Sequence, residues 1–271
     1  MKKEDNVEEF YDANAKNYQN TEFPKGYSNA RAAMSFADDI TWHFMLKYLP
    51  KEKDIQILDA GAGDGYWAQK YVELGYKNIV LTDISSGMLE QAKERFAKFS
   101  IEHNAKFVKS DIADMKEIKS ASFDYVYSQY DPVSYCLKPR EALKELARVA
   151  KKGAYIITCL DTKYRRVPEL IETGMLKEAK ELLETNITNE FGHPQYNMTW
   201  EELADCYDNA GLEVVEIVGA PVFMHQIDEK ILTKLESYSK IRKDLLEIEL
   251  KYCTKPSLVN FAGHLQMIGR K

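Results

Sequence analysis

The spacing of hydrophobic residues changes near residue 55. Before that point, apolar residues recur every three or four positions over residues 3–20 and 29–48, which predicts two amphipathic helices. Beyond it, short apolar runs alternate with segments of helical period. Strands are predicted over residues 55–59, 78–83, 105–109, 122–128 and 154–160, and helices over residues 66–74, 86–99 and 140–150. Strands that alternate with helices are typical of a parallel sheet covered on both faces.

The pattern is less regular after residue 160. We predict a helix over 168–183, a polar and aromatic connector over 187–198, a helix that begins with a capping box of Thr199 and Glu202, a strand over 212–218, one long charged helix over 228–252 and a closing strand over 262–269. The expected fold class is α/β: a doubly wound, mostly parallel seven-stranded sheet with an N-terminal helical flap and a helical, aromatic insertion near the C-terminus.

The predicted domain organisation follows from these elements. Residues 1–50 form a flap over the ligand site, and residues 51–271 form the core domain, with lid elements at about 161–198 and 220–258. A chain of 271 residues, of which 45% are hydrophobic and 30% charged, suits one such domain with additions.

Charge and cysteine content narrow the class of protein. A net charge of −6 makes a nucleic-acid partner less expected, and no apolar run is long enough to cross a bilayer. The N-terminus lacks a signal-peptide core, so we expect a cytoplasmic protein without a membrane partner. We expect a monomer or a homodimer. The four cysteines show no C-x-x-C spacing, which favours reduced thiols and no metal site.

A glycine-rich turn follows the first predicted strand. Gly61, Gly63 and Gly65 lie between that strand and the helix that begins at Tyr66. Glycines let the backbone approach a ligand closely, and the first turn of the helix supplies free N–H groups. An ordinary strand-to-helix turn needs only one glycine, whereas the dinucleotide fingerprint G-x-G-x-x-G would place a glycine where Tyr66 stands. The turn alone therefore leaves the ligand open.

Three acidic residues come at or just after the ends of successive strands. Asp59, Asp83 and Asp111 would lie at one edge of the sheet, because sequential parallel strands tend to be neighbours. Asp83 is placed to accept hydrogen bonds from a ribose diol, and Asp111 could accept one from an exocyclic amine. Each acid alone could be a helix cap. Together with the glycine turn they indicate an adenosine-like ligand.

Four segments carry a resemblance to a known family. They read Leu-Asp-Ala-Gly-Ala-Gly-Asp-Gly at 58–65, Thr-Asp-Ile-Ser-x-x-Met-Leu at 82–89, Ser-Asp-Ile at 110–112 and Phe-Asp-Tyr-Val at 123–126. In their order and spacing the chain resembles the class I S-adenosylmethionine-dependent methyltransferases. It looks closest to the branch that contains quinone-biosynthesis and other small-molecule methyltransferases. The resemblance covers roughly residues 10–160.

The resemblance implies a cofactor, S-adenosylmethionine, and a product, S-adenosylhomocysteine. It implies cofactor contacts at Tyr11, Tyr18, Asp59, Gly61, Ala62, Gly63, Gly65, Asp83, Ile84, Met88, Asp111, Ile112, Gln129 and Tyr130. In this interpretation the glycine turn lies along the methionine moiety, with Asp59 near its ammonium group. Ile84 and Met88 pack on the adenine. The tyrosines of the pattern Tyr-Asp-x-x-Ala-x-x-Tyr at 11–18 fold over the cofactor.

Methyl transfer from a sulfonium requires little of the protein beyond positioning. A general base is needed only where the acceptor atom is protonated at neutral pH. The weak candidates for such a role are Tyr130, Asp131, His193 and Tyr196, and Tyr135, Asp161 and His225 are also expected near the mouth of the site. Each of these is more often structural, so no catalytic residue is assigned.

The acceptor is less constrained than the cofactor. The Asp-Pro-Val-Ser segment at 131–134 departs from the Asp-Pro-Pro-aromatic loop of enzymes that methylate nucleic-acid bases. The basic cluster at 163–166 is either a solvated loop or a site for an anionic group. Aromatic residues at 191–196 and 223–225 suggest a partly covered pocket. We therefore expect methylation of a small molecule by in-line displacement. The alternatives are a protein or RNA methyltransferase and a non-catalytic cofactor-binding regulator.

Overall fold

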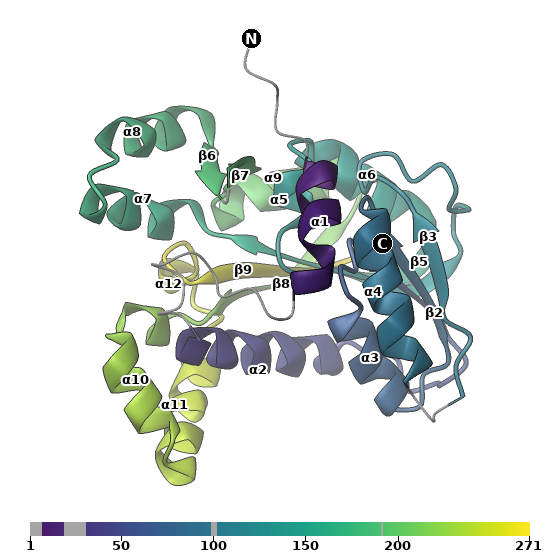
Figure 1. Ribbon diagram of the computed structural model, residues 1–271, viewed down its shortest axis with the longest axis horizontal. Helices are drawn as coiled ribbons and strands as arrows, with labels where there is room; N and C mark the ends of the chain where they lie inside the picture. The colour runs from purple at the N-terminus through teal and green to yellow at the C-terminus, as the bar shows by residue number, and fades with distance from the viewer. Residues whose placement is uncertain (1–6, 19–30, 99–101, 191) are drawn as a thin grey trace.

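The structure is a computed structural model that describes residues 7–18, 31–98, 102–190 and 192–271 (Figure 1). Its centre is a seven-stranded sheet in the order β3-β2-β1-β4-β5-β9-β8. The strands are β1 (Gln56–Ala60), β2 (Asn78–Asp83), β3 (Lys106–Lys109), β4 (Phe123–Ser128), β5 (Ala150–Asp161), β8 (Glu213–Ala220) and β9 (His264–Arg270). Only β9 runs against the others, because it pairs antiparallel with both β5 and β8. The predicted mostly parallel, doubly wound sheet is confirmed.

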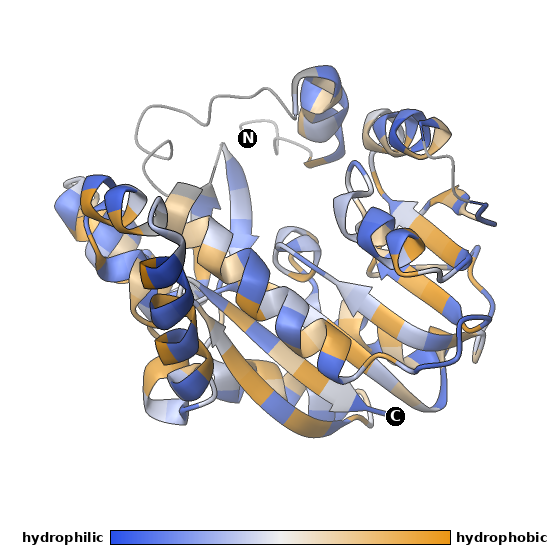
Figure 2. Cartoon of the chain, turned by 90° about the horizontal axis from the view of Figure 1, so that it is seen from below, coloured by the Kyte–Doolittle hydropathy of each residue, from blue (hydrophilic) through white to orange (hydrophobic). Residues whose placement is uncertain are grey.

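Helices cover both faces of this sheet. One layer consists of α2 (Arg31–Lys47), α3 (Tyr66–Glu73) and α4 (Ser86–Ala97), and the other of α6 (Pro139–Val149) and α9 (Trp200–Asn209). Successive strand residues point to opposite layers: Ile57 packs in the core beneath α2 and α3, and Leu58 packs in the core beneath α6 and α9. Burial on both faces explains the near-continuous apolar runs, and Figure 2 shows hydrophobic positions gathered along the strands.

A short helical segment lies over the carboxyl edge of the sheet. It consists of α1 (Val7–Asn14) and the 3-10 turn η1 (Ala15–Asn17), and both contact α4 (Figure 1). The boundary of the flap at residue 50 stays a prediction. In the structure, α2 packs into the same core as the sheet. None of the helices in the described parts of the chain combines the length and apolar character needed to cross a bilayer.

Residues 163–197 form an excursion between β5 and α9. It contains α7 (Lys163–Glu172), α8 (Leu176–Thr185) and a hairpin of β6 (Ile187–Glu190) and β7 (His193–Tyr196). Its two ends meet, because Thr162 and Met198 form a parallel bridge and the Lys163 N–H donates to the Met198 carbonyl at 3.1 Å. The helices share a small core of Leu170, Ala179 and Leu182. Figure 1 shows α7 and α8 projecting from one side of the molecule.

Further helices follow β4 and β8. The loop after β4 contains α5 (Pro132–Tyr135), and the segment between β8 and β9 contains η2 (Met224–Gln226), α10 (Glu229–Glu236), α11 (Ser239–Tyr252) and α12 (Pro256–Val259). Buried Glu249 on α11 fixes the start of this segment. Its carboxylate accepts the backbone N–H groups of Val222, Phe223 and Met224, each at 2.8 Å.

The structure corrects four predicted elements. The helix expected over 168–183 is two helices, separated where Gly174 adopts a φ of 79°. The helix expected over 228–252 also divides, because Tyr238 is extended. The connector over 187–198 contains the β6–β7 hairpin, and β5 begins at Ala150 instead of residue 154. The predicted capping box is confirmed: Thr199 Oγ1 accepts from the Glu202 N–H, and Glu202 accepts from the Thr199 N–H.

Candidate functional site

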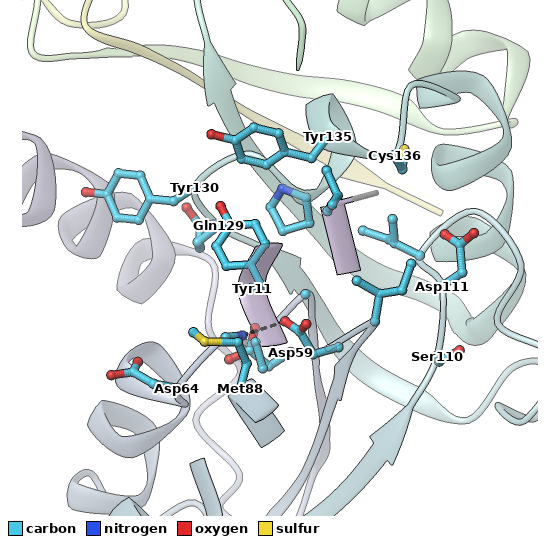
Figure 3. Close-up of a pocket in the computed structure, with 18 of the residues that line it drawn as sticks. Tyr11, Asp59, Asp64, Met88, Ser110, Asp111, Gln129, Tyr130, Tyr135 and Cys136 are labelled. Atoms are coloured by element: carbon cyan, nitrogen blue, oxygen red, sulfur yellow. Dashed lines mark hydrogen bonds between the residues drawn. The ribbon is translucent and has the colours of Figure 1, made fainter. Parts of the chain in front are cut away.

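A cavity of about 1000 Å³ lies at the carboxyl ends of β1, β2 and β4, with α1 over it (Figure 3). All predicted cofactor positions except Gly65 line it: Tyr11, Tyr18, Asp59, Gly61, Ala62, Gly63, Asp83, Ile84, Met88, Asp111, Ile112, Gln129 and Tyr130. Tyr135, expected near the mouth of the site, also lines the cavity, whereas the prediction missed other lining residues, among them Val7, Asp64, Tyr66, Trp67, Arg95, Ser110, Cys136, Lys138 and Pro194. Residues from six segments of the sequence therefore share one cavity.

The glycine turn is fixed by its neighbours. The N–H groups of Gly61 and Ala62 both donate to the Thr82 carbonyl at 2.8 Å, which ties the turn to the end of β2. Gly61 has a φ of 77°, and a Cβ there would lie 2.3 Å from the Pro132 side chain. Only glycine fits that position. Gly65 has another role, since a Cβ there would meet Phe96 at 3.1 Å in the core and not the cavity.

The three predicted acids do gather at this edge. Asp83 Oδ2 accepts from the Gly63 N–H at 2.8 Å, and Asp83 Oδ1 accepts from the Ser85 N–H at 2.9 Å. Burial raises the pKa of Asp83, and these two hydrogen bonds oppose the rise. Burial also raises the pKa of Asp59 well above its ordinary value, although the Tyr127 hydroxyl donates to its carboxylate at 3.0 Å.

An ion pair supports the turn from the other side. The Arg95 guanidinium, on α4, donates to the Asp64 carboxylate and, through Nε at 2.9 Å, to the Asp64 carbonyl. Asp64 is thus partly neutralised, whereas Asp59 and Asp83 are held by neutral donors. The resulting cavity wall is acidic. Such a wall suits a ligand that carries positive charge.

The loop after β4 has an unusual backbone. Tyr130 and Asp131 have φ values of 55° and 78°, a left-handed conformation that residues other than glycine adopt rarely. The Asp161 N–H donates to Asp131 Oδ1 at 2.7 Å and holds the loop in place. This conformation directs Gln129 and Tyr130 to the cavity wall (Figure 3).

Gln129 provides a direct test of whether the cavity fits a polar ligand. Gln129 is only 4% exposed. Among the residues that the structure describes, neither its Nε2 nor its Oε1 has a hydrogen-bond partner. Buried amides are normally paired, so Gln129 offers one donor and one acceptor to a ligand. The methionine end of S-adenosylmethionine, with an ammonium and a carboxylate, has the complementary groups.

Only one of the four catalytic candidates lines the cavity. Tyr130 does, but burial raises its pKa well above the ordinary value, and its hydroxyl donates to Asp38 on α2. It is therefore a poor proton acceptor. His193 lies beneath Phe10, with ring centroids 4.3 Å apart. Tyr196 is half-buried outside the cavity wall, and burial raises its pKa.

Asp131, the remaining candidate, belongs to a buried cluster behind the cavity wall. Ligand atoms of Asp131, Asp161 and His264 lie within 4.8 Å of one another. Asp161 Oδ1 is 2.9 Å from the Arg165 guanidinium and 3.4 Å from His264 Nε2. Burial alone would raise the pKa of Asp161, but Arg165, His264 and Arg166 outweigh it and lower that pKa to about 2. A metal cation at Asp161 Oδ1 would have to displace the Arg165 guanidinium. We therefore interpret the cluster as an ion-pair network.

The basic segment 163–166 is paired within the fold, with Arg165 in this network and Lys163 outside it. Lys163 donates to Asn186 at 2.7 Å, and Arg166 donates to Glu169 at 2.9 Å. Both cationic residues are less than one-tenth exposed, so the solvated-loop interpretation is wrong for them. Burial lowers the pKa of His225 to about 4, which leaves this predicted mouth residue neutral.

Comparison with known proteins places this geometry in context. A family model described as a methyltransferase domain matches residues 57–153. The tRNA 5-carboxymethoxyuridine methyltransferase of Escherichia coli (strain K12) is 22% identical over 80% of this chain and 80% of its own length. A ubiquinone/menaquinone biosynthesis C-methyltransferase of Campylobacter jejuni is 30% identical over 51% of this chain and 59% of its own length. A malonyl-[acyl-carrier protein] O-methyltransferase of Marinomonas sp. is 33% identical over 45% of each chain.

Solved structures share the fold. An S-adenosylmethionine-dependent methyltransferase from Methanosarcina mazei has a TM-score of 0.60, 18% identity, and coverage of 84% of this chain and 96% of that one. Geranyl diphosphate C-methyltransferase from Streptomyces coelicolor, solved with S-adenosylhomocysteine, has a TM-score of 0.57, 11% identity, and coverage of 86% and 79%. At these identities the likeness concerns the arrangement of strands and helices.

Proposed function

Because the chain belongs to the class I S-adenosylmethionine-dependent methyltransferases, we propose that it transfers the methyl group to a small-molecule acceptor by in-line displacement. The enzyme uses S-adenosylmethionine and releases S-adenosylhomocysteine. The observation that carries the small-molecule proposal is that two elements, α1 and the β6–β7 hairpin, contact each other beside the cavity. The Phe10 ring on α1 packs on His193 of the β6–β7 hairpin, and each of these two elements also contributes to the cavity lining, through Tyr11 and Pro194.

We propose that the cavity residues predicted for the cofactor hold it as the resemblance implies. Asp83 would accept hydrogen bonds from the ribose diol, and Asp111 would accept one from the adenine amine. Asp59 and Gln129 would bind the methionine end. The supporting observations are that these side chains share one cavity wall and that the glycine turn leaves room for a ligand at its surface. Gly65 would support this site from the core.

When bound, the cofactor supplies an electrophilic methyl group on a sulfonium whose leaving group is neutral. In the displacement, the acceptor's lone pair forms the new bond to carbon, and the electrons of the carbon–sulfur bond stay on sulfur. The protein's residues would orient the two partners and exclude water. Tyr130 is not suited to remove a proton, given its raised pKa. An acceptor that attacks without having to lose a proton, or one already deprotonated at neutral pH, would need no base from Tyr130.

Calorimetric titration tests the cofactor site. We expect wild type to bind S-adenosylhomocysteine with a dissociation constant of about 1 μM (about −8 kcal/mol), and Asp83→Ala to lose that binding. Asp54→Ala removes an exposed acid outside the cavity and is the matched control. Wild-type affinity in Asp83→Ala would contradict the assignment of the ribose site. Failure of folded wild type to bind either cofactor form would contradict the proposed function.

A second acceptor class has one observation in its favour. The relative that matches this chain over 80% of both lengths acts on tRNA. The two proposals separate when the enzyme is incubated with methyl-labelled cofactor and either bulk tRNA or a metabolite extract. Label in the acid-soluble, small-molecule fraction supports our proposal. Label only in precipitated RNA or protein would overturn it.

A further inference from the structure

Asp12 attaches α1 to the cofactor half of the sheet. Its Oδ1 atom accepts a hydrogen bond from the Ser85 hydroxyl at 2.6 Å and another from the Gly87 N–H at 2.8 Å. Ser85 is the N-cap of α4 and Gly87 lies in its first turn, where a negative charge is favourable. These hydrogen bonds lower the pKa of Asp12. A second tie lies one turn away, where Lys109 pairs with Glu8 at 2.5 Å.

The contact between α1 and α4 is close enough to require a glycine. A Cβ on Gly87 would lie 3.0 Å from the Ala15 Cβ and 3.2 Å from the Asp12 Cα. Gly87 is in α4 and its φ is not in the left-handed region, so the helix itself would favour alanine there. The glycine is explained by the approach of α1 alone.

The inner face of α1 reaches into the cavity. Val7 and Tyr11 of α1 line it together with Tyr18, which follows η1, and Figure 3 draws Tyr11 among the lining residues. The Tyr11 ring packs on Tyr135 at a centroid distance of 6.1 Å. A ligand in the cavity is therefore covered by α1 only while α1 stays attached to α4.

Ser85 connects this attachment to the proposed ribose site. Its hydroxyl donates to Asp12 and accepts from the Met88 N–H at 3.0 Å. Its own N–H donates to Asp83 Oδ1 at 2.9 Å. One residue thus joins the carboxylate on the cover to the carboxylate that would hold the ribose.

We infer that Asp12 is a positioning residue that latches α1 over the cofactor, so that opening of the latch sets the rate of product release. This inference rests on the proposed cofactor site. The latch would strengthen binding when the cofactor orders Asp83 and Ser85, and by the same linkage a bound cofactor would hold α1 closed. The latch is a property of residues 8–18 and α4, and the acceptor plays no part in it.

Two measurements on the same variants test the latch. Stopped-flow displacement gives the dissociation rate of S-adenosylhomocysteine, and brief trypsin treatment reports cleavage after exposed Lys16. We expect Asp12→Ala to release the product roughly tenfold faster, the loss expected for an exposed charge-assisted pair of hydrogen bonds. Cleavage after Lys16 should accelerate in parallel, and S-adenosylhomocysteine should protect wild type more than the variant.

Three further variants separate the latch from other roles. Gly87→Ala should show the same two effects without removing a polar group, because its methyl pushes α1 from α4. Asp12→Asn keeps an acceptor oxygen but loses the negative charge, so both effects should be smaller than those of Asp12→Ala. Glu9→Ala removes an exposed acid from the same helix and should change neither readout.

Distinct outcomes would overturn distinct claims. If Asp12→Ala and Gly87→Ala release S-adenosylhomocysteine at the wild-type rate, the latch is wrong even though the cofactor site stands. If release accelerates but cleavage after Lys16 does not, Asp12 acts through its charge and not by holding α1, which also overturns the latch. If wild type does not bind S-adenosylhomocysteine, the proposed function fails first.

Discussion

The two halves of the sheet edge are built in different ways. On the β1–β2–β3 side, the functional groups belong to consecutive residues of one turn and to the ends of neighbouring strands. On the β5–β9–β8 side, the buried network joins Asp131, Asp161, Gln195 and His264, which come from four separate segments. The groups of the first half lie close together in the sequence or at the ends of neighbouring strands. The groups of the second half are brought together only when the chain folds. A site of the first kind can be recognised in a sequence, and one of the second kind cannot.

On the β1–β2–β3 side of the sheet edge, the largest effect is expected for Gly61→Ala. The new methyl would overlap the Pro132 side chain at 2.3 Å, so we expect the turn to move and binding of S-adenosylhomocysteine to be lost. Gly75→Ala is the matched control, because Gly75 has a similar φ of 87° but no atom within 4 Å of the added Cβ. Unfolding in urea should show about 2 kcal/mol more destabilisation for the first variant, on the scale of overpacking. Equal losses in both variants would show that the contact with Pro132 is unimportant.

The separateness of the excursion can be tested with Leu182→Ala. Leu182 is fully buried in the small core between α7 and α8, and its truncation should cost about 3 kcal/mol of local stability. Hydrogen exchange should accelerate over residues 163–197, while the dissociation constant for S-adenosylhomocysteine should change less than about twofold. Leu176→Ala, on the same helix at a position 57% exposed, should leave exchange unchanged. A matching fall in cofactor affinity would show that the two halves are coupled.

The ion-pair network should make stability depend on pH in the acidic range. The folded-state pKa of Asp161 is about 2, below its ordinary value of 3.8. Its contribution is therefore present above about pH 4 and lost as pH falls toward 2, an amount of about 2 kcal/mol. Urea unfolding at a series of pH values should show a steeper loss for wild type than for Asp161→Asn. Asp54→Asn should keep the wild-type slope, and an unchanged slope in Asp161→Asn would contradict the assignment.

A smaller effect is expected at the adenine end of the cavity. Asp111→Asn should weaken S-adenosylhomocysteine binding about tenfold, the loss of one charge-assisted hydrogen bond. An analogue in which the adenine amine is replaced by oxygen should bind wild type more weakly but distinguish less between wild type and the variant. Asp114→Asn is the control, because Asp114 pairs with exposed Lys116 outside the cavity wall. If the variant still prefers the amine to the same degree, Asp111 does not contact it.

These differences explain what the sequence could predict. The strands, the glycine turn and the gathering of Asp59, Asp83 and Asp111 follow from local periodicity and strand order, and all are present in the structure. The contact between Tyr130 and Asp38 joins residues 92 positions apart, and no local pattern announces it. The contact of Arg95 on α4 with Asp64, just before α3, is also a tertiary contact that no local pattern predicts.

The two helices that were predicted as continuous differ in how well the sequence marks their breaks. Gly174 is a helix-ending residue in the left-handed conformation, so the break between α7 and α8 could have been read from the sequence. The break before α11 lies at Ser237 and Tyr238, which are tolerated inside helices. There the extended conformation of Tyr238 has no helix-ending residue type to mark it, and periodicity does not reveal it.

The junction at Thr162 and Met198 has a consequence for how such enzymes diversify. Because the two ends of the excursion lie one backbone hydrogen bond apart, a segment of another length or composition can be exchanged for it without displacing β5 or α9, and the entropic cost of a longer loop grows slowly with its length. The turn and strand ends that line the cavity on the β1–β2–β3 side and the excursion are thus free to change at different rates. A graft made between Thr162 and Met198 would exchange the excursion while leaving that side of the cavity in place.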